Sequence, residues 1–111
     1  MDTLLDRFLR YVKVETTAVE DSKTYPSSAS QLDLGKMLAE ELRTMGIADA
    51  KQDEHGIVLG TLPGNAPGAP TIAWCSHVDT SPEFTAKNVK PVIHKNYDGN
   101  DIVLPGDPSR I

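Results

Sequence analysis

Apolar residues recur at helical spacing in two segments of the first half of the chain. The spacing over residues 2–13 predicts a short amphipathic helix, which Asp2 or Thr3 can cap. Its apolar face is formed by Leu4, Leu5, Phe8, Leu9 and Val12. The opposite face is polar but not basic, so a helix that packs against a core is favoured over one that lies on a membrane.

The second helical pattern covers residues 28–45 and is the clearest in the chain. Pro26, Ser27 and Ser28 open it, with a serine as the expected N-cap. Its apolar stripe consists of Leu34, Leu38, Leu42 and Met45. Gly46 follows directly, where a left-handed residue is expected to end the helix. Residues 14–25, between the two helices, lack periodicity; this long loop is either functional or a solvated connector.

Strand patterns follow the second helix. Residues 48–53 and 57–62 predict two strands around a tight turn at residues 54–56, and residues 63–70 form a proline- and glycine-rich loop. Residues 71–76 are apolar without alternation, which is typical of a strand covered on both faces, with Trp74 and Cys75 in the core. Residues 92–94 and 102–104 flank Asp98-Gly99, which predicts a hairpin. The fold class is therefore α/β, a mixed β-sheet with flanking helices.

Composition narrows the class of protein. The 111 residues suffice for one small domain, and the formal net charge is −5. Lysine and arginine are scattered rather than gathered in a stripe, which disfavours nucleic-acid binding. A single cysteine excludes an intrachain disulfide and suits a reducing compartment. The acidic N-terminus does not resemble a signal peptide, and no apolar stretch reaches membrane-spanning length. We therefore expect a cytoplasmic protein without a membrane partner.

The candidate chemistry lies where the strand at residues 71–76 ends. His77 and Asp79 are two residues apart, so in an extended backbone both side chains project to the same face. A histidine that binds a metal usually has a carboxylate or carbonyl partner that fixes its ring. The same pair can also form a structural hydrogen bond in a protein that is not an enzyme. His55 in its turn and His94 in its strand are expected at the surface, and the spacing of Asp98 and Asp101 does not fit an EF-hand loop.

The residues around this pair resemble the N-terminal part of the peptidase T family, tripeptide aminopeptidases among the di-zinc exopeptidases. The resemblance runs along the whole chain. It is carried by residues 4–12, 26–28, 41–46, 87–89 and 96–102, and above all by the string Ser-His-Val-Asp-Thr-Ser-Pro at residues 76–82.

The resemblance implies a cytosolic enzyme that removes the N-terminal residue of tripeptides with two zinc ions. It implies that His77 ligates one zinc, and that Asp79 is the catalytic-site carboxylate that contacts the histidine without binding metal. Residues 1–111 would then be the N-terminal portion of a zinc-exopeptidase catalytic domain. The rest of that domain, with the remaining ligands and the general base, and an inserted dimerisation domain would be missing.

Three expectations follow from this resemblance. One histidine cannot supply the three or four protein ligands of a zinc site, so these residues alone should be inactive and bind zinc weakly or not at all. Uncovered apolar surface should favour a homo-oligomer. A zinc carboxypeptidase or deacylase of the same fold is the nearest alternative, because such enzymes share the His-x-Asp pattern.

Overall fold

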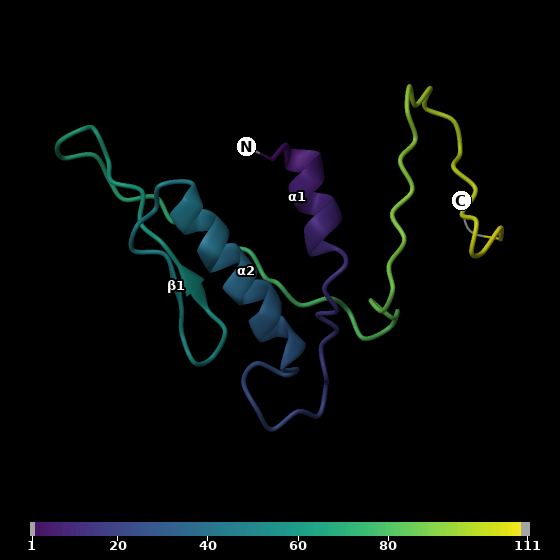
Figure 1. Cartoon of the computed structure of the whole chain (residues 1–111), viewed down its shortest axis with the longest axis horizontal. Helices are drawn as coiled ribbons and strands as arrows, with labels where there is room; N and C mark the ends of the chain where they lie inside the picture. The colour runs from purple at the N-terminus through teal and green to yellow at the C-terminus, as the bar shows by residue number, and fades with distance from the viewer. Residues whose placement is uncertain (1, 110–111) are drawn as a thin grey trace.

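The computed structural model describes residues 2–109. Helix α1 (Leu4–Tyr11) comes first, followed by helix α2 (Ser30–Thr44) and a small antiparallel sheet of β1 (Lys51–Gln52) and β2 (Val58–Leu59). The sheet lies beside α2, and the chain after β2 runs in an extended path past both helices to the C-terminal segment, residues 91–109 (Figure 1). The α/β class is confirmed as two helices and a two-stranded sheet, but the sheet of the described residues is antiparallel and not the mixed sheet that the sequence predicts.

Helix α1 begins as its sequence predicts. Thr3 is the N-cap: its Oγ1 accepts a hydrogen bond from Asp6 N (3.1 Å), and the Asp6 carboxylate accepts one from Thr3 N (2.9 Å). This reciprocal pair is a capping box. The prediction that α1 packs against a core is wrong, because no residue of the helix is buried and Leu4, Leu5 and Phe8 are exposed. The described polar contacts of α1 with α2 come from Arg7, Arg10 and Tyr11, not from these apolar side chains.

Helix α2 is confirmed almost over its predicted length. Its N-cap is Ala29, which makes no side-chain capping bond, rather than the expected serine. Gly46 has the predicted positive φ (+98°). Gly46 N donates to Arg43 O (2.9 Å) and Ile47 N to Leu42 O (3.0 Å), the two bonds of a Schellman motif.

The hairpin after α2 is also confirmed, with shorter strands than predicted. Lys51 pairs with Leu59 and Gln52 with Val58. The Asp53 carboxylate accepts hydrogen bonds from His55 N (2.9 Å) and Ile57 N (2.8 Å), which closes the turn. The sheet packs on α2 at Gly35, where the side chains of Gln52 and Val58 approach the helix. Leu34, Ala39 and Ala50 are the buried apolar residues of the core.

The prediction of a buried strand at residues 71–76 is wrong for this structure. The segment is extended but has no strand assignment, Ile72 and Trp74 are 75% and 93% exposed, and Cys75 is exposed as well. A strand requires neighbours to take its backbone hydrogen bonds, and residues 2–109 place none beside this segment. The composition of the segment is that of a covered strand, but its cover is not among the described residues.

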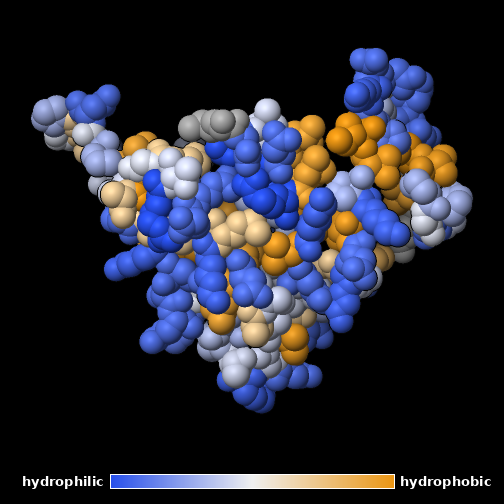
Figure 2. Space-filling view, in the orientation of Figure 1, coloured by the Kyte–Doolittle hydropathy of each residue, from blue (hydrophilic) through white to orange (hydrophobic). Residues whose placement is uncertain are grey.

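The predicted hairpin around Asp98-Gly99 is also wrong, because a two-stranded hairpin is marginally stable without further packing and the described residues provide no third strand beside it. Residues 92–94 and 102–104 are not paired, and Leu104 instead forms a short bridge with Asp107. The radius of gyration, 17.5 Å, exceeds the roughly 13 Å of a compact domain of about 100 residues. Hydrophobic side chains gather at the surface of this C-terminal segment, in orange at the upper right of Figure 2. Among the described residues, neither helix has the length and apolar character needed to cross a membrane.

Candidate functional site

His77 and Asp79 contact each other directly, as their spacing predicts. Nδ1 of His77 lies 2.9 Å from the carboxylate Oδ1 of Asp79 and 2.9 Å from its main-chain oxygen. Both oxygens act as acceptors, so in the neutral ring the proton belongs on Nδ1, a tautomer inferred from these partners. The side chains of His77 and Asp79 are 82% and 46% exposed. The arrangement directs the lone pair of His77 Nε2 away from Asp79 and makes it accessible to a ligand.

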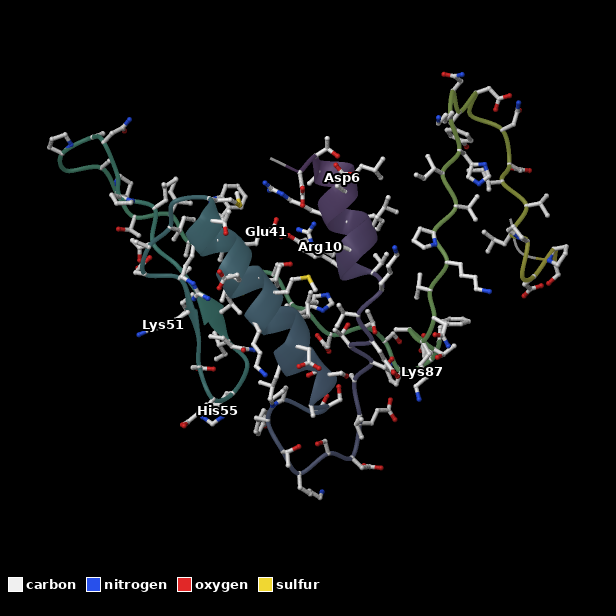
Figure 3. The ribbon with its side chains drawn as sticks, in the orientation of Figure 1. Asp6, Arg10, Glu41, Lys51, His55 and Lys87 are labelled. Carbon is white, nitrogen blue, oxygen red and sulfur yellow. The ribbon has the colours of Figure 1, made fainter. Side chains whose placement is uncertain are left out.

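The loop between the helices holds the end of this motif. Thr80 N donates to Thr16 O (3.1 Å), and Ala18 N donates to Thr80 O (2.9 Å). The two segments run parallel here, with Thr17 opposite Thr80. A longer ion-pair contact joins Lys87 to Glu15 (3.9 Å), and Figure 3 shows Lys87 beside this part of the loop. Residues 14–25 are thus more than a solvated connector, because they bind the backbone next to Asp79.

The described residues supply one candidate zinc ligand and not a complete site. Within residues 2–109, no group of three or more His, Cys, Asp or Glu side chains is arranged to hold a metal ion. His55 is exposed in its turn, 3.6 Å from Glu54, as the sequence predicts. Zinc takes three or four protein ligands, so the donor set fits one position of such a site and not the site as a whole.

The acidic turn at Asp98 has a structural explanation. Its carboxylate accepts hydrogen bonds from the backbone N (3.1 Å) and side-chain Nδ2 (2.9 Å) of Asn100. These two bonds lower the pKa of Asp98. Gly99 has a positive φ of +89°, which suits the tight turn. The turn therefore uses this carboxylate to order its own backbone.

A second polar cluster joins α1 to α2. Glu41 Oε2 accepts a hydrogen bond from Arg10 Nη2 (2.6 Å), and Arg7 Nε lies 2.9 Å from Oε1 in an ion pair that lacks hydrogen-bond geometry. Arg10 and Glu41 face each other between the two helices in Figure 3. Burial acts to raise the pKa of Glu41, but hydrogen bonds from Tyr11 and Arg10 and the charges of both arginines outweigh it and lower the pKa. The cluster fixes the relative position of the helices.

Sequence comparison then identifies the relatives of the chain. No family profile matches it. Peptidase T of Bacillus thuringiensis (strain Al Hakam) and of Bacillus cereus (strain 03BB102) are each 46% identical to it over 104 residues, 93% of the chain. Peptidase T of Bacillus thuringiensis subsp. konkukian (strain 97-27) is 47% identical over 102 residues.

The chain is similar to peptidase T. The resemblance inferred from the motif string is thereby confirmed along nearly the whole sequence. The chain spans about a quarter of the length of these peptidase T relatives. Identity at this level over 104 residues implies a common ancestry and a shared local fold for the matched part.

Gln31 belongs to the site although no sequence motif marks it. Gln31 is buried in the first turn of α2, and its Nε2 donates to Thr16 O (3.3 Å). It lies three residues before Leu34, so it occupies a position where the apolar stripe of the helix calls for a hydrophobic side chain. A polar residue in a buried stripe needs hydrogen-bond partners, and that is the signal that singles it out.

Proposed function

We propose that this chain forms part of a zinc-dependent tripeptide aminopeptidase, in which His77 ligates one of two zinc ions and Asp79 orients the histidine. The observation that supports this most strongly is the pair of 2.9 Å contacts from His77 Nδ1 to the two oxygens of Asp79. A carboxylate behind a histidine fixes the tautomer that offers Nε2 to a metal. The similarity to peptidase T supports the reaction class.

The chemistry divides between the metal and the chain. Bound zinc would activate a water molecule and polarise the carbonyl of the scissile peptide. His77 provides one neutral nitrogen donor, which borderline-soft zinc accepts. Asp79 holds the proton on Nδ1 and the ring in one orientation. The remaining ligands and the general base must come from residues beyond those described, and the greater length of the relatives leaves room for them.

This function is tested in a hybrid enzyme in which a relative supplies the residues that the chain lacks. This chain replaces the matched segment of peptidase T from Bacillus thuringiensis, and the hybrid is assayed for tripeptide hydrolysis and zinc content. We expect an active hybrid and a loss of at least about 100-fold for His77→Ala, because removing a ligand should cost no less than the upper end of the effect of removing a partner behind a ligand. His55→Ala is the matched control and should retain activity. An active hybrid that is indifferent to His77→Ala would refute the assignment.

The chain by itself should be inactive, because it offers a single ligand. Zinc binding by purified residues 1–111 is measured by calorimetry. Hydrolysis is assayed separately by adding a tripeptide in the presence of zinc. We expect no hydrolysis and weak or undetectable zinc binding. Robust hydrolysis by these residues that is lost in His77→Ala would overturn this expectation.

Two alternatives are separated by direct measurements. A zinc carboxypeptidase or deacylase would share the His77–Asp79 contact, and a panel of tripeptides, N-acyl amino acids and C-terminally blocked peptides distinguishes them. A purely structural role for the pair is disfavoured by the exposure of His77, because a hydrogen bond in water contributes little to stability. The proposal also includes a cytoplasmic location, a homo-oligomeric state and no nucleic-acid or membrane partner.

A further inference from the structure

Gln31 is a polar side chain on the buried face of α2. It is 5% exposed and lies on the same face as Leu34, Gly35 and Ala39. Burial of an amide is unfavourable unless its hydrogen bonds are made. Its presence on this face therefore points to a specific set of partners.

The partners of Gln31 lie in the loop before α2. Its Nε2 is 3.1 Å from Ser27 Oγ, 3.3 Å from Thr16 O and 3.5 Å from Thr17 O. An amide nitrogen carries two hydrogens, and the contact at 3.5 Å is at the limit of a hydrogen bond. Ser27 and Thr16 are thus the principal acceptors. Thr16 connects Gln31 to the segment that contains His77 and Asp79.

Thr16 O is a shared acceptor. It accepts one hydrogen bond from Gln31 Nε2 and another from Thr80 N (3.1 Å), which its two lone pairs permit. Thr16 is 2% exposed, so water does not readily replace either donor. Loss of the amide of Gln31 would leave a buried carbonyl with one partner and free the loop to shift.

The nitrogen of Thr80 belongs to the same planar peptide group as the main-chain oxygen of Asp79. That oxygen lies 2.9 Å from His77 Nδ1. Fixing the N–H end of this peptide therefore fixes the C=O end that contacts the histidine. Consecutive hydrogen bonds also polarise one another, which strengthens the contact at His77.

We propose that Gln31 is a positioning residue for His77, acting through Thr16 O and the peptide group between Asp79 and Thr80. The amide of Gln31 holds residues 16–18, these hold Thr80, and the peptide before Thr80 sets the tautomer and orientation of the histidine ring. The catalytic importance of this relay rests on the proposed function, whereas the relay itself does not.

The test replaces the amide without changing the size of the side chain. Gln31→Met keeps the length and removes the donors. Gln52→Met is the matched control: Gln52 Nε2 also donates to a backbone carbonyl, Leu32 O (3.1 Å), but Gln52 belongs to β1 and is not one of the residues that link Gln31 to Thr80. Both variants are made in the full 111-residue chain. Amide hydrogen exchange and the ¹⁵N shifts of the His77 ring are measured at about pH 8.5, where an ordinary histidine is neutral.

The expected changes are confined to the relay. In Gln31→Met the amide of Thr80 should exchange about fivefold faster, the factor that corresponds to one ordinary hydrogen bond. The ratio of the Nε2–H to the Nδ1–H tautomer of His77 should rise about twofold to fivefold by the same reasoning. Gln52→Met should leave both quantities unchanged. Gln31→Asn, with an amide of shorter reach, should give the same change in smaller amount, and it carries the test if Gln31→Met does not fold.

Unchanged exchange at Thr80 and an unchanged tautomer ratio in the Gln31 variants would overturn the proposal, as would equal effects from Gln52→Met. In the active hybrid enzyme, Gln31→Met should lower kcat more than it raises KM. If the hybrid is inactive while the exchange and tautomer results hold, the proposed function fails and the relay stands. The two failures are thus distinguishable.

Discussion

At the scale of single residues, the site depends on His77. Its Nδ1 contacts Asp79, and its Nε2 has no described partner among residues 2–109. Asp79 provides two acceptors for the same nitrogen, one from its side chain and one from its backbone. The backbone contact survives any substitution of the side chain that leaves the loop in place. The carboxylate is therefore expected to tune the histidine rather than to determine its presence at the site.

Substitution of Asp79 by asparagine should weaken zinc binding in the hybrid enzyme by about 10- to 100-fold, the usual effect of losing a partner behind a metal ligand. The amide keeps the shape but not the charge that stabilises Nδ1–H. Competition with a chelator of known affinity measures the change. Asp101→Asn, in the C-terminal segment, is the control. Equal zinc affinity in Asp79→Asn and the unmodified hybrid would contradict the prediction.

Glu41 makes the folding stability of the chain depend on pH in the acidic range. Its pKa in the folded chain is below its ordinary value of 4.5, so the ionised form favours folding. Its contribution is complete above the unfolded pKa and is lost as the pH falls through the folded pKa. In a series of thermal melts from about pH 7 to about pH 3, Glu41→Gln should be less stable than the native chain at the upper end and should lose less on acidification. Glu40→Gln, a neighbour paired with Arg43 at the surface, is the control. Parallel curves for Glu41→Gln and the native chain would refute this role.

At the scale of secondary structure elements, the two helices and the hairpin beside α2 followed from the sequence, whereas the strand at residues 71–76 and the hairpin around Asp98-Gly99 did not. The Thr3 cap, the extent of α2 and the turn at Gly46 depend on residues within a few positions. The sequence offers Thr3 as one of two caps, predicts α2 to within two residues at its start and one at its end, and predicts the positive φ of Gly46. The strand at residues 71–76 depends on pairing partners that the composition of the segment does not identify. The pairing of Thr16 and Thr17 with Thr80 has no local sequence pattern that would predict it. The role of Gln31 does not follow from the sequence, because its partners at residues 16, 17 and 27 lie in a loop whose path no local pattern predicts.

The end of α2 offers a direct test at this scale. Gly46 has a φ of +98° and open space around the position that a Cβ would occupy, so substitution introduces backbone strain and no collision. Gly46→Ala should lower the free energy of unfolding by about 1 kcal/mol, the cost of a left-handed L-residue. Urea denaturation followed by circular dichroism measures it. Gly64→Ala, also in open space but without a positive φ, is the control. Equal midpoints for the two variants would show that the helix end does not depend on glycine.

At the scale of the whole molecule, the described residues carry many more large apolar side chains than they bury. Leu34, Ala39 and Ala50 are buried, whereas Ile72, Trp74 and the apolar residues of the C-terminal segment are exposed. Exposed apolar surface of this extent is typical of a face that packs against another part of a protein. The hybrid enzyme, in which the remainder of peptidase T is present, is therefore expected to be more soluble than the chain.

The chain alone should associate with itself through this surface. Sedimentation velocity at increasing concentration should show oligomers, and a hydrophobic dye should bind. Trp74→Ser should reduce both effects, because Trp74 is 93% exposed within an extended apolar segment. Tyr25→Ser is the matched control, since Tyr25 is 84% exposed but lies in the loop before α2. A stable monomer that does not bind the dye would contradict this prediction.

The bridge between residues 16–18 and Thr80 also has a consequence for the order of folding. Helix α2 and its hairpin use contacts within about 30 residues of one another, whereas the bridge joins segments far apart in the chain and bears the larger loop-closure entropy. During synthesis the helix and hairpin can therefore form first, and the loop waits for Thr80 to emerge. The histidine would acquire its fixed orientation as one of the last local events, so slowing the release of residues beyond 80 would delay the maturation of the site without affecting α2.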